Sequence, residues 1–207
     1  MSRGGIESVS IAKLTDDADV GFGTFYNYFE NIDDVASQVL FVVVNDLGRR
    51  IDITTASLEV SNPAAIQALS IRFTIREMLT NPMWKWWLKK PELLVEQINV
   101  CLSPFGVRDL KLGIAAGQYN VLELDANIIL GQATWMLVGG VIDILENKID
   151  GLDELKLIKI IMRAMGVSGG YENELVQMGA PTLLKPNIDF SNRPPHDLSV
   201  LLQKGIL

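Results

Sequence analysis

Cysteine and histidine are almost absent from this chain. Its 207 residues include one cysteine, Cys101, and one histidine, His196. A single cysteine excludes an internal disulfide. This pair of residues also provides neither the ligands of an ordinary zinc site nor a plausible nucleophile with a histidine base. We therefore expect no metal, no cofactor and no enzymatic activity.

Positive charge is scarce as well, since 18 Lys and Arg residues are outnumbered by 25 Asp and Glu residues, which gives a net charge of −7. This balance argues against a protein that binds nucleic acid or a membrane surface through bulk positive charge. It leaves room for specific DNA binding through a few side chains and backbone amides. The N-terminus has no charged start followed by an apolar stretch and a cleavage site, so we expect a cytoplasmic protein.

Long hydrophobic runs are limited to residues 128–145. This segment approaches the roughly 20 apolar residues that a membrane-spanning helix needs. Gln132, Thr134 and Asp143 interrupt it, and ionisable groups are rare at membrane depth. We interpret the segment as a buried core or dimer helix and expect no membrane partner.

Alternating strand patterns are missing too, and Gly, Pro and Asn or Asp residues separate segments with helical periodicity. The sequence therefore predicts an all-α fold. The expected helices cover about 11–17, 21–26, 32 to the mid-fifties, 63–81, 92–102, 105–118, 125–147 and 153–165.

One compact motif is present, in residues 10–29, which read SIAKLTDDADVGFGTFYNYF. Two short helices separated by a tight turn at 18–20 form a helix-turn-helix, in which the second helix enters the major groove of DNA. Its apolar inside is predicted to consist of Ile11, Leu14, Val20 and Phe25.

The second helix of the motif carries the groups that suit DNA. Gly21 and Gly23 bring its N-terminus close to a phosphate, where free backbone amides bind an anion. Thr24, Tyr26 and Tyr28 supply hydroxyl groups for phosphates and base edges.

Residues 23–29, GTFYNYF, resemble the signature of the tetracycline-repressor (TetR) family in order and spacing. The resemblance implies that Ser10 caps the first helix and contacts phosphate, that Gly21, Phe22, Gly23 and Thr24 face the groove, and that Tyr26 and Tyr28 contact bases or backbone. Weaker matches at 109–119, 125–131 and 162–167 resemble a sensing domain of this family. A ligand-responsive transcriptional repressor is the function that the resemblance implies.

The chain departs from the family pattern in its N-terminal helix-turn-helix region. Family members have a further helix before position 5, and this chain begins at what resembles the loop after it, so we expect an incomplete three-helix unit. Ile32 occupies a position where the family often has Lys. Residues 1–34 contain two basic and seven acidic residues, a local charge of −5, which is poor for DNA. A helical small-molecule or partner-binding protein whose head no longer binds DNA therefore stays open as an alternative.

Three parts are expected: a helix-turn-helix over 1–34, a ligand-binding and dimerisation domain over 35–178, and a loosely docked tail over 179–207. The expected partners are operator DNA, a second copy of the chain and an unidentified small, largely apolar effector. The predicted ligand pocket is lined by Phe73, Met78, Trp87, Leu94 and Ile98. The dimer interface is predicted to pair the helices at 125–147 and 153–165 with their twins. Its predicted residues are Gly131, Gly139 and Gly140 for close approach, and Leu155, Ile158, Ile161, Met162 and Met165 as an apolar stripe.

Overall fold

The computed structural model describes residues 9–57, 62–121, 124–167 and 170–188, and within these ranges every regular element is a helix. This confirms the all-α prediction. The helices are α1 (Ile11–Asp17), α2 (Phe22–Tyr26), α3 (Ile32–Ala56), α4 (Pro63–Thr80), α5 (Trp84–Trp87), α6 (Pro91–Cys101), α7 (Ser103–Ala115), α8 (Ala126–Leu145), α9 (Glu154–Ala164) and α10 (Tyr171–Gln177).

Side-chain caps fix where several helices begin. Ser10, Asn31, Asn62 and Asp153 each accept a hydrogen bond from the backbone N–H three residues later. Such caps satisfy amides that have no partner inside the helix, and each stabilises the helix by about 1 kcal/mol. The sequence therefore sets these four boundaries locally.

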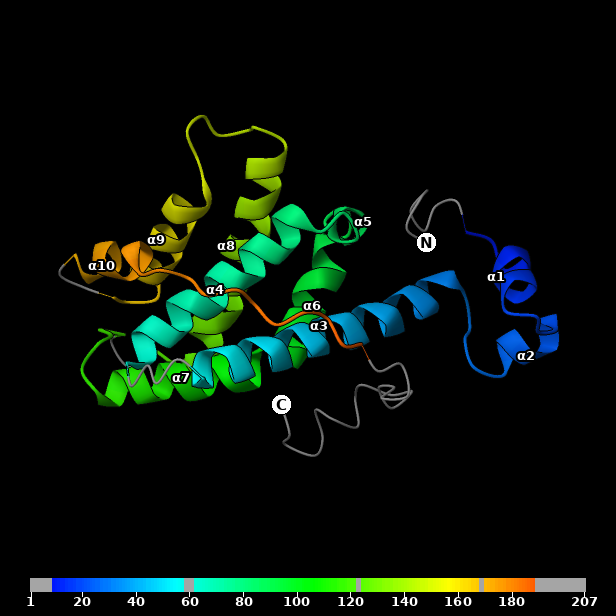
Figure 1. Ribbon diagram of the computed structural model, residues 1–207, viewed down its shortest axis with the longest axis horizontal. Coiled ribbons are helices and arrows are strands. Elements are labelled where there is room, and N and C mark those ends of the chain that lie inside the picture. The colour runs from blue at the N-terminus through cyan, green and yellow to red at the C-terminus, as the bar shows by residue number, and fades with distance from the viewer. Residues whose placement is uncertain (1–8, 58–61, 122–123, 168–169, 189–207) are drawn as a thin grey trace.

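The chain forms a small head and a larger body, joined by one long helix (Figure 1). The head consists of α1 and α2, and it lies at the N-terminal end of α3. The remaining helices gather around the rest of α3. Because α3 is continuous over 25 residues, the predicted boundary at residue 34 falls inside this helix rather than in a linker.

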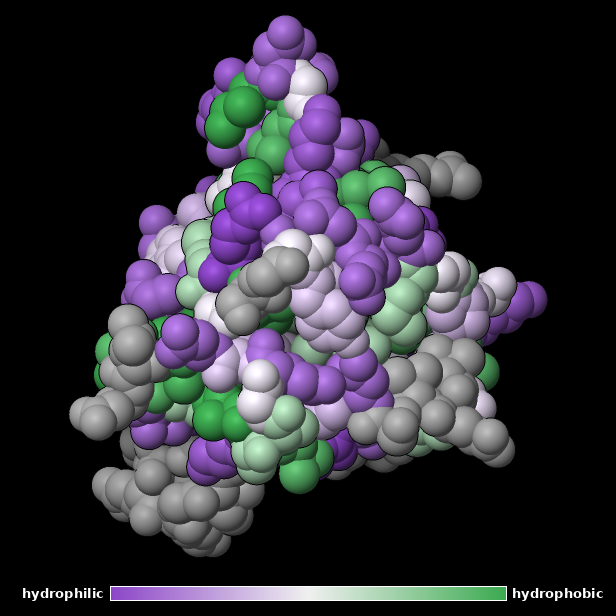
Figure 2. All heavy atoms as spheres, turned by 90° about the vertical axis from the view of Figure 1, so that its left-hand side faces the viewer, coloured by the Kyte–Doolittle hydropathy of each residue, from purple (hydrophilic) through white to green (hydrophobic). Residues whose placement is uncertain are grey.

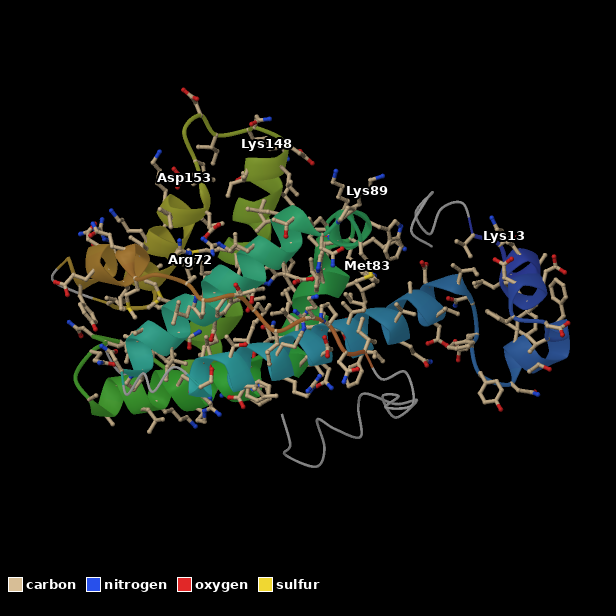
Figure 3. All side chains as sticks on the ribbon, in the orientation of Figure 1. Lys13, Arg72, Met83, Lys89, Lys148 and Asp153 are labelled. Carbon is tan, nitrogen blue, oxygen red and sulfur yellow. The ribbon has the colours of Figure 1, made fainter. Side chains whose placement is uncertain are left out.

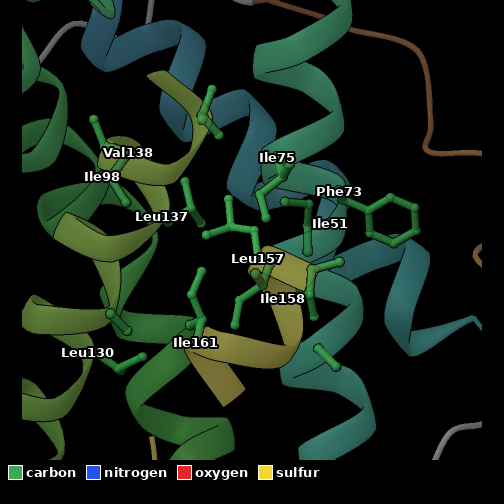
Figure 4. Packing of buried hydrophobic residues seen from close by; sticks show 14 of the residues in the cluster. Ile51, Phe73, Ile75, Ile98, Leu130, Leu137, Val138, Leu157, Ile158 and Ile161 are labelled. Carbon is green, nitrogen blue, oxygen red and sulfur yellow. The ribbon is translucent and has the colours of Figure 1, made fainter. Parts of the chain in front are cut away.

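The core of the body is built around α4 and α8. α4 packs against α3, α7, α8 and α9, and α8 packs against α4, α6, α7 and α9. Apolar side chains from these helices point toward one another, among them Ile75, Leu137 and Ile161 (Figure 4). The body is thus a layered helical bundle with one continuous hydrophobic core.

By length and composition alone, α8 is the one helix of the described ranges that could cross a membrane. α8 packs against four other helices of the body, and this packing also explains why its sequence is apolar. Packing within the chain accounts for the apolar residues of α8 that face these neighbours, and 44% of its apolar window is buried.

Ion pairs tie distant parts of the body together. Arg72 Nε lies 2.8 Å from Glu154 Oε1, and Arg72 Nη1 donates to Met178 O at 2.8 Å, so α4 is linked to the start of α9 and to the end of α10 (Figure 3). Arg50, which is buried, pairs with Asp46 at 2.7 Å and donates to Leu184 O at 3.0 Å.

The C-terminal segment 179–188 runs across α4 and α3 as an extended strand-like strap without helix (Figure 1). Arg50 Nη1 donates to the carbonyl of Leu184 in this strap, and none of residues 179–188 is buried, so the predicted loose docking of the tail stays a prediction. The rest of the predicted tail, including His196, lies outside the described residues.

The end of the body that carries α10 has a mixed surface. Apolar and polar residues alternate over this face, and the apolar ones do not merge into one broad patch (Figure 2). This face has the composition of an ordinary solvated surface.

Candidate ligand cavity and nucleic-acid interface

The head is a pair of short helices joined by the predicted tight turn. Asp19 adopts the left-handed conformation with φ of 51°. Val20 N donates to Thr15 O at 2.9 Å, which closes the end of α1. This pattern terminates a helix and redirects the chain, and α2 follows after Gly21.

The apolar inside of the head is smaller than predicted. Phe25 is buried, and its ring centroid lies 5.5 Å from that of Phe29. Ile11 and Leu14 are half-buried. Val20 is 42% exposed, so its assignment to the inside is wrong. The reason is the turn itself, because Val20 stands outside both helices, where neither covers it.

Every residue predicted to contact DNA is exposed at the surface of the head: Ser10, Gly21, Phe22, Gly23, Thr24, Tyr26 and Tyr28. The rings of Phe22 and Tyr26 are 54% and 57% exposed. Aromatic side chains with that much exposure offer apolar area to a partner. Contact of these seven residues with DNA stays a prediction.

A cavity with a volume of about 80 Å³ lies inside the body, among α3, α4, α6, α7, α8 and α9. One water needs roughly 10–15 Å³ on this measure, so the space holds several waters or a small organic molecule. Its apolar wall includes Ile51, Ile98, Leu130, Leu137 and Ile161 (Figure 4). Residues from the C-terminal half of α3, from Gly48 to Thr55, form one side.

A charged cluster stands at one wall of the cavity. Arg108 Nε donates to Asp109 Oδ1 at 2.8 Å, and Arg108 Nη2 donates to Asp52 Oδ1 at 2.9 Å. Asp109 is buried, while Arg108 and Asp52 are partly exposed. Burial raises the pKa of the Asp109 carboxyl above its ordinary value, and the ion pair with Arg108 opposes this rise.

The cavity differs from the predicted pocket. Of the five residues predicted, only Ile98 lines it. Phe73, Met78, Trp87 and Leu94 are at most 4% exposed and belong to the close-packed core instead. The prediction selected apolar residues on helical stripes, and such stripes mark burial in general rather than an opening within the core.

Sequence reasoning missed the polar lining of this cavity. Gln67, Ser70 and Thr74 follow one another along α4 at spacings of three and four, so they share one face of a helix that is otherwise buried. A polar stripe on a core helix is the signal that would have found them. Asp109, although buried, was noted only as part of the family resemblance.

The predicted dimer residues of α9 are turned inward. Ile158, Ile161, Met162 and Met165 are at most 1% exposed within a single chain, and Figure 4 shows Ile158 and Ile161 among the core residues. These four cannot touch a second copy. Their stripe is the face by which α9 packs on its own body, which the sequence pattern cannot distinguish from an interface.

The other predicted interface residues divide between core and surface. A Cβ on Gly140 would lie 2.3 Å from Leu157 Cδ1, so Gly140 serves close packing of α8 on α9 within the chain. Gly131 and Gly139 have open space beside them, and Leu155 is 41% exposed. These three positions stay available to a partner.

The described residues offer little support for a cysteine nucleophile or for a metal site. Cys101 is buried, and desolvation raises the pKa of its thiol to about 12, so the thiol is protonated at neutral pH and a poor nucleophile. Within the same ranges, no group of three His, Cys, Asp or Glu residues is placed to hold a metal ion.

Comparison with known proteins gives a family match and similar solved structures. Residues 62–177 match the family model of the tetracyclin repressor-like C-terminal domain. The structure of RolR without ligand superimposes with a TM-score of 0.79 at 22% sequence identity, covering 89% of this chain and 94% of that one. RolR in complex with resorcinol gives 0.77 at 22% identity, covering 88% and 89%. The curated proteins contain no match.

Proposed function

The chain belongs to the tetracycline-repressor family, and from this premise we propose that it is a DNA-binding transcriptional repressor released from its operator by a small, largely apolar ligand. One observation carries the proposal. The helix α3 adjoins the head at its N-terminal end, and residues of its C-terminal half line the cavity. A single rigid element therefore connects a DNA-reading motif with a ligand-sized space.

In the proposed complex, α2 enters the major groove of the operator. Its first amides approach a phosphate, while Thr24, Tyr26 and Tyr28 make hydrogen bonds to phosphates or base edges. The exposure of these side chains on the head supports this assignment. A regulator of this kind acts in the cytoplasm, where the DNA is accessible to it.

The proposal includes a homodimer, because one helix-turn-helix reads only half of an operator. α8 keeps an apolar outer face with Ile128 58% exposed and Trp135 45% exposed, and Gly131 and Gly139 stand open beside them. A second copy placed on this face would cover apolar surface that a monomer leaves in water. The two heads would then lie about 34 Å apart, the spacing of successive major grooves.

Release from DNA follows from a population shift. A ligand that prefers one arrangement of the cavity walls also selects one position of α3, and α3 carries the head. A change in the angle of α3 alters the distance between the two heads of a dimer. RolR, a protein of the same fold, has been solved in complex with the ligand resorcinol, and this supports a ring-sized ligand for the present chain.

The acidic head favours a second candidate, a helical small-molecule binding protein that does not bind DNA. Residues 9–34 contain one basic residue, Lys13, and six acidic residues. Each phosphate contact contributes through neutralised charge, so this composition weakens nonspecific binding. The repressor is preferred because the exposed residues of α2 have no role in the second candidate.

Selection from a random duplex library at physiological salt separates the two candidates. The repressor enriches a palindromic sequence, and Thr24→Ala and Tyr26→Phe each weaken binding to it by about 1 kcal/mol, the usual contribution of one hydrogen bond. Thr80→Ala, which removes an exposed threonine hydroxyl from the body, is the matched control and leaves binding unchanged. A library that shows no enrichment would favour the second candidate.

A further inference from the structure

A buried ion pair lies on the side of α3 that carries the strap. Arg50 Nε is 2.7 Å from Asp46 Oδ2, one turn earlier in the same helix, and both side chains are at most 5% exposed. Glu77 of α4 lies 3.6 Å from Arg50 Nη1. Charged groups that lose their hydration need polar partners close by. Whatever covers this pair must therefore offer it hydrogen bonds.

The strap offers two such hydrogen bonds. Arg50 Nη1 donates to Leu184 O at 3.0 Å, and Asn187 N donates to Asp46 Oδ1 at 3.4 Å. α4 holds the other end, where Arg72 donates to the last carbonyl before the strap at 2.8 Å. The strap thus runs from an anchor on α4 to an anchor on α3 (Figure 1).

The strap and the cavity lie on opposite faces of α3. Gly48 and Asp52 line the cavity, and they stand two residues after Asp46 and Arg50, respectively. Two residues turn an α-helix by about 200°, so such side chains point to opposite sides. A movement of α3 that widens or narrows the cavity therefore changes the distance that the strap spans.

Little apolar area holds the strap in place. None of its residues is buried, and Leu184 is 47% exposed. Its apolar contacts come from Ala180, Leu183 and Ile188, which pack partly buried against the core. Segments with few buried contacts open at low free energy. The strap can therefore leave α3 while the body stays folded, and the ion pair that it covers stays intact within one helix.

We propose that the strap is a detachable clamp, which fixes the position of α3 while docked and lets α3 move when released. Its effect on DNA rests on the proposed function, in which the two heads of a dimer must keep one spacing. A docked strap presents α3 and its head preorganised, whereas a released α3 must be ordered when the operator binds. The strap therefore favours operator binding. A ligand that displaces α3 from the cavity side works against it.

Two adjacent leucines provide a matched pair of variants in the full chain. Leu183 packs against the core, whereas Leu184 is exposed and contributes its backbone carbonyl to the anchor on α3. Leu183→Asp should release the strap, because a carboxylate does not stay against an apolar core. Leu184→Asp adds the same charge and leaves the strap docked. Both variants should keep the helical circular dichroism of the native chain.

Spin labels on the head and the body report the position of α3 without DNA. Lys13 on α1 and Lys148 after α8 are exposed (Figure 3), and each is replaced by cysteine for labelling. An excess of unlabelled chain ensures that the measured distances lie within one chain. Leu183→Asp should broaden the distance distribution between the labels, because α3 then adopts more positions. Leu184→Asp should leave the distribution unchanged.

Operator binding is the second readout, measured with the duplex that the random library yields. Leu183→Asp should weaken it by at least about threefold, because the head is no longer preorganised. Leu184→Asp should leave it unchanged.

An unchanged distance distribution in Leu183→Asp would overturn the clamp, and so would equal broadening in both variants. Loss of the native helical signal in Leu183→Asp would show that the strap is a part of the core that cannot detach. Tighter operator binding by Leu183→Asp would contradict the stated effect of the docked strap. A broadened distribution in a chain that enriches no DNA would keep the clamp and reject the repressor.

Discussion

In the head, Phe25 is the single apolar residue of α1 and α2 that is buried, whereas the body buries apolar residues from every one of its longer helices in one cluster. Burial of an apolar side chain stabilises a fold by roughly 1.5–3 kcal/mol, so stability accumulates in the body and stays small in the head. Helices of five and seven residues are marginal in water without packing. The head therefore gains little stability from apolar burial within α1 and α2.

This difference suits a protein that reads DNA with one part and senses a ligand with another. The head exposes most of its second helix, and under the proposed function this exposure leaves those residues free to contact DNA. The body buries apolar residues from many helices in one cluster, and the cavity lies among these helices. Regions of low local stability are commonly the ones that move in function.

The largest effect is expected from a charge placed in the core of the body. Ile161 is 0% exposed, and its neighbour Ile160 is 52% exposed. Ile161→Asp would bury a carboxylate without a partner, at a cost of several kcal/mol that rivals the whole stability of a domain. We expect loss of cooperative unfolding by circular dichroism. Ile160→Asp should keep the native melting curve, and a melt equal to that of Ile161→Asp would contradict the inward orientation of Ile161.

A second test removes the buried cation that joins α3 to the strap. Arg50 lies 2.7 Å from Asp46 and 3.6 Å from Glu77, and it also holds Leu184 O. Arg50→Met removes the buried partner of Asp46 and leaves it only the half-exposed Arg49, so it should destabilise the body by about 3 kcal/mol in denaturant titration. Arg49→Met removes a half-exposed neighbour from the same Asp46 and should cost under about 1 kcal/mol. If both variants lower the free energy of unfolding by similar amounts, the contacts of Arg50 with Leu184 and Glu77 do not stabilise the body.

A third test separates the head from the body. Phe25→Ala removes the one buried ring of the head, a change that typically costs about 3–5 kcal/mol in a core. The loss should be local, so hydrogen exchange over residues 11–27 should become fast while the melting curve of the body stays unchanged. Tyr26→Ala, at an exposed position on the same helix, should leave exchange unchanged. A lowered melting temperature of the body would show that head and body unfold as one unit.

Local signals predicted the fold better than they predicted the site. The caps at Ser10, Asn31 and Asn62 and the helical periodicity placed the helices correctly, because both are properties of neighbouring residues. α10 was not predicted. It begins after Gly170, a left-handed residue without a capping side chain, so the usual start signal is missing.

The cavity and the interface depend on how helices pack, and periodicity does not contain that information. The stripe of Ile158, Ile161 and Met162 was identified correctly as apolar, yet the same stripe suits a core or an interface. Only the position of α9 against α8 and α4 decides between them. In the same way, Gln67 on α4 and Asp109 on α7 both line the cavity only because of how these two helices pack.

The smallest effect on stability is expected from an exposed ion pair near the N-terminal end of α3, next to the head. Lys90, just before α6, lies 2.6 Å from Asp33 in the first turn of α3, and its ammonium also lies 5.1 Å from the ring of Trp86. The side chains of Lys90 and Asp33 are 41% and 71% exposed. Solvent and salt screen such pairs, so Lys90→Met should reduce stability by under about 1 kcal/mol, and by less as salt increases. Methionine keeps apolar contact with Trp86, and Lys89→Met is the control for lost charge alone. A loss of several kcal/mol in Lys90→Met, measured by denaturant titration at low salt, would contradict this expectation. It would mean that the contact with Asp33 contributes strongly to the stability of the protein.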